Sequence, residues 1–568
     1  MELTPEILER KFEKAKSQRS QWESHWQDCY DYALPRRDGA IQSQPIGEMK
    51  RQHLFDGTAP DAVEQLASSI MAELTPAWSS WFQLIPGSEI PEETKADTEQ
   101  ALQQLSQTIQ GHFDRSNFIV ELHQCYLDLV TVGTACLLFE EAPLGEASAF
   151  KFTAVPLGEV VMEEGGKGRL DIVYRKSTLN ETQLQSRFPN VSLPEELVIN
   201  DENLDQKTFH VLEAVQPNKS GRYDYMAILT NETASDGHPM ILTKGSFESS
   251  PFITFRWIKA PGEIYGRSPV MKALPDIKTA NKIVELMLKN ASIAVTGIWQ
   301  ADDDGVLNPA NIKLTPGTII PKAVGSKGLQ PLTTASDINL SEALLEKIRA
   351  QISLALYRDQ LGQPMAQGMS ATEFMERTES ATRNLSAIFG RLHGELILPT
   401  AERALAILRR RGDIGDIMID GREINLQINA PLAMRQRMQK AKPIIRWLDM
   451  IKQASPDAVG LLKSNNIGRY LADLLGVPET FLHSEEEQTS RATQGGNQVM
   501  DRADSMPADG MQDLGQYLSD MDPDMLLNQL PPDMQKMAQQ MAKDVTDGKL
   551  DLSQVQSRLS ATPTSSQV

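Results

Sequence analysis

The feature that most constrains this chain is a long amphipathic pattern that runs from Met369 to Arg403. Ser370 can cap a helix while the side chain of Glu373 reaches back to the free amide at the cap, an arrangement called a capping box. Apolar residues then recur at close to helical period over many turns, at Phe374, Ala381, Leu385, Ile388, Leu392 and Leu396. The sequence therefore predicts an unusually long helix with one buried face, and Pro399 predicts a kink within it.

The segment directly before this helix, LGQPMAQGM, is rich in Gly, Gln and Met and contains a proline. This composition predicts a flexible loop. In one interpretation the loop is a hinge. In the other it lines a pore, where Gln363, Met365, Gln367 and Met369 touch DNA without strong charge pairing. A mobile loop joined to a long helix indicates a mechanical arrangement rather than a catalytic one.

Length and cysteine usage narrow the class of protein. A chain of 568 residues is too long for one core and suggests about three or four domains or subregions. Its charged first residues carry no apolar export signal, and no apolar run approaches the ~20 residues that a membrane helix needs. The three widely spaced cysteines, Cys29, Cys125 and Cys136, predict free thiols in a reducing cell. We expect a soluble protein that is made in the cytosol and does not contact a membrane.

The net charge of −20 argues against a protein that grips nucleic acid over its whole surface, because phosphate binding needs concentrated Lys and Arg. Two interpretations of this acidity stay open. It serves solubility alone, or it forms a wall that repels phosphates on average and lets DNA slide past sparse basic spots.

The first half of the chain is predicted to be helical and then β-rich. Helical patterns cover residues 4–34, 60–74 and 118–132, and Trp22, Trp26 and Tyr30 fall on one face of the first. We interpret these aromatic residues as core or subunit contacts. From Phe150 to Trp257, short alternating runs separated by turn formers are typical of antiparallel strands.

Two further helices are predicted, over residues 268–292 and 341–360, on either side of a small β insertion. Ser268 is the expected cap of the first helix, and Pro275 can bend it. Its apolar face consists of Ile277, Val284, Leu288 and Ala291. The apolar residues of the second helix are Leu344, Leu345, Ile348, Ile352 and Leu356.

Lys278, Lys282 and Lys289 form another face of the first helix together with Glu285, because steps of three and four residues return to the same side. This stripe has two interpretations. It is a solvated face with an ion pair between Glu285 and Lys289, or it meets DNA phosphates briefly inside a channel. Ammonium groups on flexible stems suit transient contacts better than rigid guanidinium groups do.

The sequence gives little support for an enzyme. It contains no phosphate loop, HExxH, CxxC or GxSxG motif, and we expect no catalytic residue, no metal site and no cofactor. His112 and His123 have no ligand partner four residues on, so structural roles are favoured. The acidic turn in the β insertion does not have the spacing of a calcium loop and is interpreted as a turn tip that can act as a docking point, formed by Asp302, Asp303 and Asp304.

After Gly412 the sequence predicts a short strand (EINLQINAP) and two or three helices to about Leu482. The remainder is rich in Met, Gln and Asp. Residues 481–568 contain 14 Asp and Glu against 6 Lys and Arg, which predicts a weakly helical, partly disordered tail. The fold class expected is therefore α+β and mainly helical.

Several motifs, taken in order, resemble the portal (head-to-tail connector) proteins of short-tailed phages. Asp56-Gly57-Thr58 is followed by a Leu-Ala…Leu-x-Pro…Trp-Phe block, and LDLVTVGTACLLFEE is similar to a helix-Gly-strand element around Gly133. YGRSP, residues 265–269, looks like the start of the first stem helix of that family. The most specific match is SATEFMER…E…LHGELILP, with Ser370 where the family more often has Thr; the matching positions are Ala371, Glu373, Arg377, Glu379, Leu392, Glu395, Leu396 and Pro399.

The resemblance covers about residues 1–480 and implies a subunit with the following regions: wing 1–267, stem helices 268–292 and 341–360, a small α/β clip 293–340, tunnel loop 361–371, a long kinked helix 372–410, a wing return with C-terminal crown helices 411–482, and an acidic tail 483–568. It implies a ring, usually of twelve copies, at one capsid vertex, through which double-stranded DNA is packaged and ejected. The implied partners are the terminase large subunit and a tail adaptor at the clip, and the major capsid and scaffolding proteins. A rival interpretation is a non-ring virion or scaffold-type interaction protein.

Overall fold

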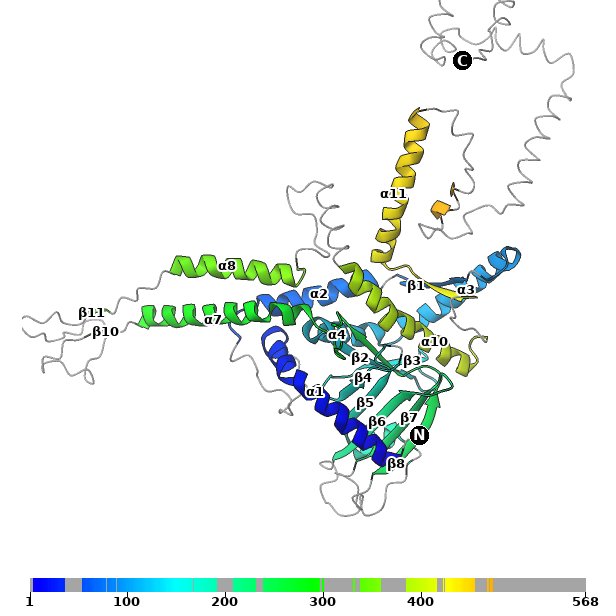
Figure 1. Ribbon diagram of the computed structural model, residues 1–568, viewed down its shortest axis with the longest axis horizontal. Helices are drawn as coiled ribbons and strands as arrows, with labels where there is room; N and C mark the ends of the chain where they lie inside the picture. Colours follow the sequence, from blue (N-terminus) through cyan, green and yellow to red (C-terminus); the bar gives the residue numbers. More distant parts are fainter. Residues whose placement is uncertain are drawn as a thin grey trace, which may run out of the picture. The chain divides into compact units, whose positions relative to one another are not determined.

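The computed structural model describes residues 4–35, 54–77, 79–87, 89–166, 168–189, 191, 208–230, 239–296, 299–300, 330–331, 338–358, 385–415, 422, 424–454, 467–468 and 470–472. All of them belong to the first of the chain's two compact units, residues 1–477 (Figure 1). The predicted capping box at Ser370, the 361–371 loop, the acidic turn at 302–304 and the tail from 483 lie outside the described residues.

Four helices form the N-terminal part: α1 (Pro5–Ala33), α2 (Thr58–Leu74), α3 (Glu92–Asp114) and α4 (Phe118–Val132). Thr4 caps α1 and Pro5 occupies its first turn, as predicted. On α1, Trp26 and Tyr30 are core residues, with the Trp26 ring edge-on to Tyr265 at 4.9 Å between centroids. Helix α3 was not predicted, because polar residues dominate it; its buried residues nevertheless recur at helical spacing, at Leu102, Leu105, Ile109 and Phe113.

The predicted β-rich region is confirmed and forms two antiparallel sheets. One sheet has the order β3-β2-β9, with β2 (Thr134–Glu141), β3 (Phe150–Ala154) and β9 (Phe252–Arg256). The other has the order β4-β5-β6-β7-β8, with β4 (Val160–Glu163), β5 (Ile172–Asn180), β6 (Thr208–Pro217), β7 (Tyr223–Leu229) and β8 (Met240–Phe247). A short helix, α5 (Glu181–Arg187), follows β5 behind a complete capping box at Asn180.

A cluster of aromatic rings packs α3 and α4 against the three-stranded sheet. Phe113 contacts Phe118 and Phe152, with ring centroids 4.7 and 5.9 Å away, and Phe139 lies 4.3 Å from Phe152. Because each of these rings is almost fully buried, the cluster supplies a large share of the apolar burial that holds this region together.

The predicted strand after Gly412 is β12 (Ile424–Ile428), and its partner is β1 (Phe82–Pro86). The pairing is antiparallel, with Phe82 opposite Ile428 and Pro86 opposite Ile424. It joins the N-terminal helices to the segment that leads into α11 (Pro431–Ala454), although the two strands are far apart in the chain.

Helices α7 (Pro269–Thr296) and α8 (Ile338–Ala355) lie side by side (Figure 1). The strands β10 (Trp299–Gln300) and β11 (Gln330–Pro331) pair in the segment between them, as a β insertion requires. Helix α8 ends before the predicted Gln360, because the backbone turns at Leu356 and Tyr357 takes a positive φ of 56°.

The long helix is described from Leu385 onward. Residues 385–392 are α-helical, His393–Ile397 form a π-helical turn (η4), and α10 (Leu398–Arg411) continues to a left-handed Gly412. Pro399 was predicted to kink the helix; the structure has a π-helical turn directly before it, and the α-helix continues through Pro399. Proline has no amide to offer the carbonyl of residue 395, and its ring crowds that carbonyl, so the wider π turn relieves the clash.

Candidate functional site

The paired helices α7 and α8 bury one side and expose another. Ile277 and Ile352 are buried, whereas Leu288, Ala291 and Leu344, which the sequence groups with the apolar faces, are exposed. Leu286 and Leu354 are exposed as well. The two helices therefore carry four leucines that are about half exposed or more, Leu286, Leu288, Leu344 and Leu354. These side chains are available for a contact with another molecule.

The predicted lysine stripe lies on α7, and each of its ammonium groups is ion-paired. Lys278 Nζ lies 2.7 Å from Asp28 Oδ2 of α1. Lys282 and Lys289 share Glu285, at 2.9 and 2.5 Å. Hydrogen bonds from Lys289 and then Lys282 lower the pKa of Glu285 to about 2. The predicted contact between Glu285 and Lys289 is therefore present, and the stripe carries less net positive charge than its lysines alone suggest.

A buried polar joint fastens both helices to the start of α2. Arg349 of α8 pairs with Asp56 at 2.8 Å, and Asp56 Oδ1 also accepts the amide of Thr58. From α7, Asn281 Oδ1 accepts the amides of Phe55 and Asp56 at 2.6 and 3.1 Å. Burial raises the pKa of Asp56, but the bonds from Thr58 and Arg349 outweigh it, so the pKa is lowered. Asp56 thus ties three helices together.

The first turn of α7 is fixed to the sheet by a contact between two glycines. Gly133 ends α4 with a φ of 79°, and a β-carbon on Gly266 would lie only 2.0 Å from its carbonyl oxygen. Ser268 then caps α7, as predicted, by accepting the amide of Met271 while its hydroxyl donates to the carbonyl of Thr131. The blocks around Gly133 and 265–269, far apart in sequence, therefore form one joint.

The π turn carries Glu395, which makes a buried ion pair with Arg256 at the end of β9. Arg256 Nη2 lies 2.7 Å from Glu395 Oε1, and the backbone amide of Arg256 donates to Oε2 at 2.9 Å. Arg256 also donates to the carbonyls of Ile264 and Gly168, and Arg391 adds a second cation to Glu395 at 3.1 Å. These contacts hold the long helix against the sheet at the π-helical turn.

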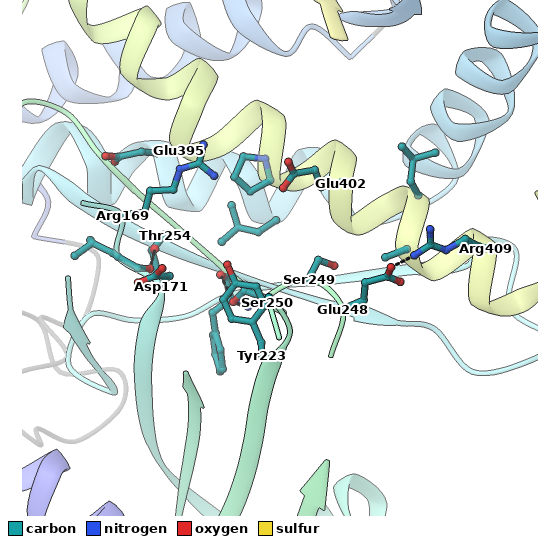
Figure 2. Close-up of a pocket in the computed structure, with 17 residues that line it drawn as sticks. Arg169, Asp171, Tyr223, Glu248, Ser249, Ser250, Thr254, Glu395, Glu402 and Arg409 are labelled. Carbon is teal, nitrogen blue, oxygen red and sulfur yellow. Dashed lines mark hydrogen bonds and ion pairs between the residues drawn. The ribbon is translucent and has the colours of Figure 1, made fainter. Parts of the chain in front are cut away.

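A polar cavity of about 290 Å³ lies next to the Arg256–Glu395 ion pair, between α10 and the loops that flank β9 (Figure 2). Glu395 and Glu402 on the long helix face it, and Glu248 is ion-paired with Arg409. Burial, followed by the charges of Asp171 and Glu402, raises the pKa of Tyr223. No histidine or cysteine lines this cavity among the described residues. Its groups hold elements together more readily than they activate a substrate.

The other candidate groups with chemical potential have structural surroundings. The three cysteines are buried and are not in disulfides, and burial raises the pKa of Cys29 and Cys136 to about 12. His112 accepts the amide of Ala149 through its ring, and burial lowers its pKa. Within the described ranges no cluster of His, Cys, Asp and Glu could hold a metal ion. In the same part of the chain, no helix combines the length and apolarity that a bilayer crossing requires.

The structure thus places Lys278, Lys282 and Lys289 on one helix, whereas Gln363, Met365, Gln367, Met369, Asp302, Asp303 and Asp304 lie outside the described residues. The ion pair between Asp56 and Arg349 and the ion pair between Arg256 and Glu395 were not predicted. Asp56 and Glu395 lie within quoted motif blocks, and that placement is the only signal in the sequence that could have pointed to them.

These contacts hold together helices and strands that are far apart in the sequence. Comparisons with known proteins show to which family such a chain belongs. A family model described as bacteriophage head to tail connecting protein matches residues 6–482. The chain belongs to this family, which confirms the resemblance found in the sequence and marks it as a component of phage particles.

The similar curated proteins are portal proteins. A probable portal protein of Bordetella phage BPP-1 is 24% identical over 84% of this chain and 88% of its own length. The portal protein of Salmonella phage epsilon15 is 22% identical over 86% and 90%, and that of Escherichia phage T7 is 20% identical over 88% and 92%.

Proposed function

We propose that this chain forms a ring-shaped channel at one vertex of a phage capsid, through which double-stranded DNA enters during packaging and leaves on infection. The match of residues 6–482 to the head-to-tail connecting protein family carries the proposal. Its support from relatives is broad, since portal proteins of several phages align with most of this chain and most of their own lengths.

In this proposal α7 and α8 are the stem, and the segment 293–340 between them is the clip that meets the terminase and later the tail adaptor. Residues 361–371 form the tunnel loop, and the helix that follows borders the channel. The flanking sheets and N-terminal helices form the wing, and α11 begins the crown. The role is structural, and the motor that consumes nucleotide is a separate protein.

The exposed leucines of α7 and α8 support assembly of several copies. Burial of a leucine side chain contributes about 1.5–3 kcal/mol, so each of these leucines that a contact between stems covers adds to the stability of the assembly. In a closed ring each subunit contacts two neighbours through two different faces, so leucines on different sides of the stem can all be buried.

The test is the native mass of the purified protein together with negative-stain images. Twelve copies of the 63.1 kDa chain give a species of about 760 kDa with a central hole in end view. If the protein is a monomer, the measurement is repeated after co-expression with the phage's scaffolding protein, which can nucleate a ring. A defined small oligomer without a pore under both conditions contradicts the proposal and favours a non-ring scaffold-type protein.

A further inference from the structure

A second cavity, of about 370 Å³, lies where β2, α5, β7, β8 and α10 meet. Part of its wall is apolar, with Phe188, Leu242 and Phe247 among the side chains that form it. The rest is charged, and the charges are balanced in number, because the wall contains the three arginines Arg187, Arg403 and Arg410 and the three glutamates Glu140, Glu141 and Glu213. A mixed wall of this kind is typical of small-molecule sites, whose volumes run from about 300 to 1,000 Å³.

Two of the arginines are paired with all three glutamates. Arg187 Nη2 lies 2.9 Å from Glu213 Oε1 and 3.4 Å from Glu140 Oε1. Arg410 is ion-paired with Glu141. Each carboxylate in the wall of the cavity therefore already has a cation in contact with it.

Arg403 is the arginine that these pairs leave out. It is 3% exposed, and its Nε and Nη1 donate to the carbonyls of Phe139 and Ser249 at 3.3 and 3.0 Å. Its guanidinium lies over the ring of Phe247, 4.9 Å from the centroid. Within the described part of the chain no carboxylate lies at ion-pair distance from Arg403, and its Nη2 donates no hydrogen bond.

The contacts of Arg403 use its donors but do not neutralise its charge. Burial, followed by the charge of Arg410, lowers the pKa of Arg403 to about 10, although Glu140 and Glu141 raise it. Buried charges in proteins are normally paired with an opposite charge, because desolvation of an unpaired ion is costly. The group that would complete this cavity is therefore an anion.

We propose that this cavity binds a small organic oxyanion, a carboxylate or a phosphate carried on a compact apolar body, and that Arg403 holds its charge. A guanidinium presents parallel N–H donors that match the oxygens of either group. The apolar body lies against Phe188, Leu242 and Phe247. The inference goes beyond the proposed function, because it depends on neither ring assembly nor DNA.

The competing occupant is an organic cation beside Glu140. Glu140 shares Arg187 with Glu213, and Glu213 is the nearer of the two carboxylates. The sign of the charge that the cavity accepts is therefore the quantity to measure.

Isothermal titration calorimetry of the full-length protein, near neutral pH and at low salt, compares four probes of similar shape. Benzoate and phenyl phosphate are the anions, benzyl alcohol is neutral, and benzylamine is the cation. We expect at least one of the anions to bind about tenfold or more tightly than the alcohol and the amine, and the tighter anion identifies the oxyanion. Inorganic phosphate, which lacks the apolar body, should bind more weakly than phenyl phosphate.

Two variants locate the binding. Arg403→Gln removes the cation and should weaken anion binding by about tenfold or more. Because Arg403 also holds two carbonyls, far-UV circular dichroism checks that this variant folds. Thr243→Trp fills the cavity from β8, leaves Arg403 in place and should abolish anion binding. Arg222→Gln and Ser246→Trp are the matched controls, since both positions are exposed and neither lines the cavity, and both should bind like the wild type.

Four results overturn the inference. They are tighter binding of benzylamine than of both anions, no anion binding up to about 10 mM, wild-type affinity in folded Arg403→Gln, and anion binding that Thr243→Trp leaves unchanged. If Arg403→Gln does not fold, Thr243→Trp decides. Native mass, measured on the same samples, reports ring assembly separately, so the inference and the proposed function fail independently of each other.

Discussion

At the scale of single residues, the contact between Gly133 and Gly266 leaves no room for a side chain. A β-carbon on Gly266 would lie 2.0 Å from a backbone oxygen, so Gly266→Ala forces the sheet and the start of α7 apart. We expect a loss of about 3 kcal/mol in the free energy of unfolding, measured with urea. Gly245→Ala is the control, since nothing lies within 4 Å of the added β-carbon. An unchanged urea midpoint for Gly266→Ala would show that the two segments move apart easily.

Asp56 gives a second prediction at this scale, which concerns pH. Its folded-state pKa lies below its ordinary value of 3.8, so its contribution to stability is complete well above that value and is lost as pH falls through the folded pKa. Asp56→Asn should therefore destabilise the protein at pH 7, and the difference from the wild type should shrink below about pH 4. Urea midpoints at pH 7 and pH 3 measure it, and a difference that stays constant with pH argues against the ion pair with Arg349.

At the scale of elements, the π turn and the end of β9 depend on each other through a buried ion pair. Glu395→Gln takes the nearest carboxylate from the guanidinium of Arg256, which is fully buried, and leaves it the carboxylate of Glu164 at 3.8 Å. Removal of one partner from such a pair typically costs about 3–5 kcal/mol. Glu346→Gln, at an exposed ion pair with Arg349, should cost less than about 1 kcal/mol. Equal urea midpoints for the two variants would mean that the Arg256–Glu395 ion pair adds nothing to stability.

Helix α7 offers an element-scale prediction about charge. Glu285→Gln frees Lys282 and Lys289 from their shared carboxylate, so in assembled rings we expect duplex DNA to bind a few-fold more tightly at low salt. The matched control is Glu342→Gln, which removes the same charge from an exposed position on α8. Fluorescence anisotropy of a labelled duplex measures the affinity of both variants, and an equal gain in the two assigns the effect to net charge alone.

At the scale of the whole molecule, the exposed leucines of α7 and α8 should decide assembly. Leu288→Asp with Leu354→Asp places two carboxylates where the proposed ring buries apolar side chains, and we expect smaller species in place of rings, with far-UV circular dichroism unchanged. Leu144→Asp, at a leucine that is 87% exposed between β2 and β3, is the control and should leave the native mass unchanged. Intact rings in the double variant would exclude these leucines from the contact between subunits.

How much of this was visible in the sequence depends on how local each feature is. The Ser268 cap and the strand after Gly412 rest on residues next to one another, so they could be predicted. The Asp56–Arg349 and Arg256–Glu395 pairs join residues remote in the chain, and no local pattern reports such a distance. The exposure of Leu288 was missed for another reason: periodicity shows that a face is apolar but does not say what covers it.

The pairing of β1 with β12 also sets the timing of folding during synthesis. The hydrogen bond between Gln83 and Asn429, beside these strands, spans 346 residues. At a ribosomal rate of about 5–20 residues per second, β1 leaves the ribosome roughly 17–70 seconds before its partner exists. In the finished fold one amide of β1, that of Leu84, is bonded to Ser106 of α3, which is translated soon after β1. A nascent chain halted before residue 424 therefore lacks the partner of β1, and that strand edge is open to pairing with another chain.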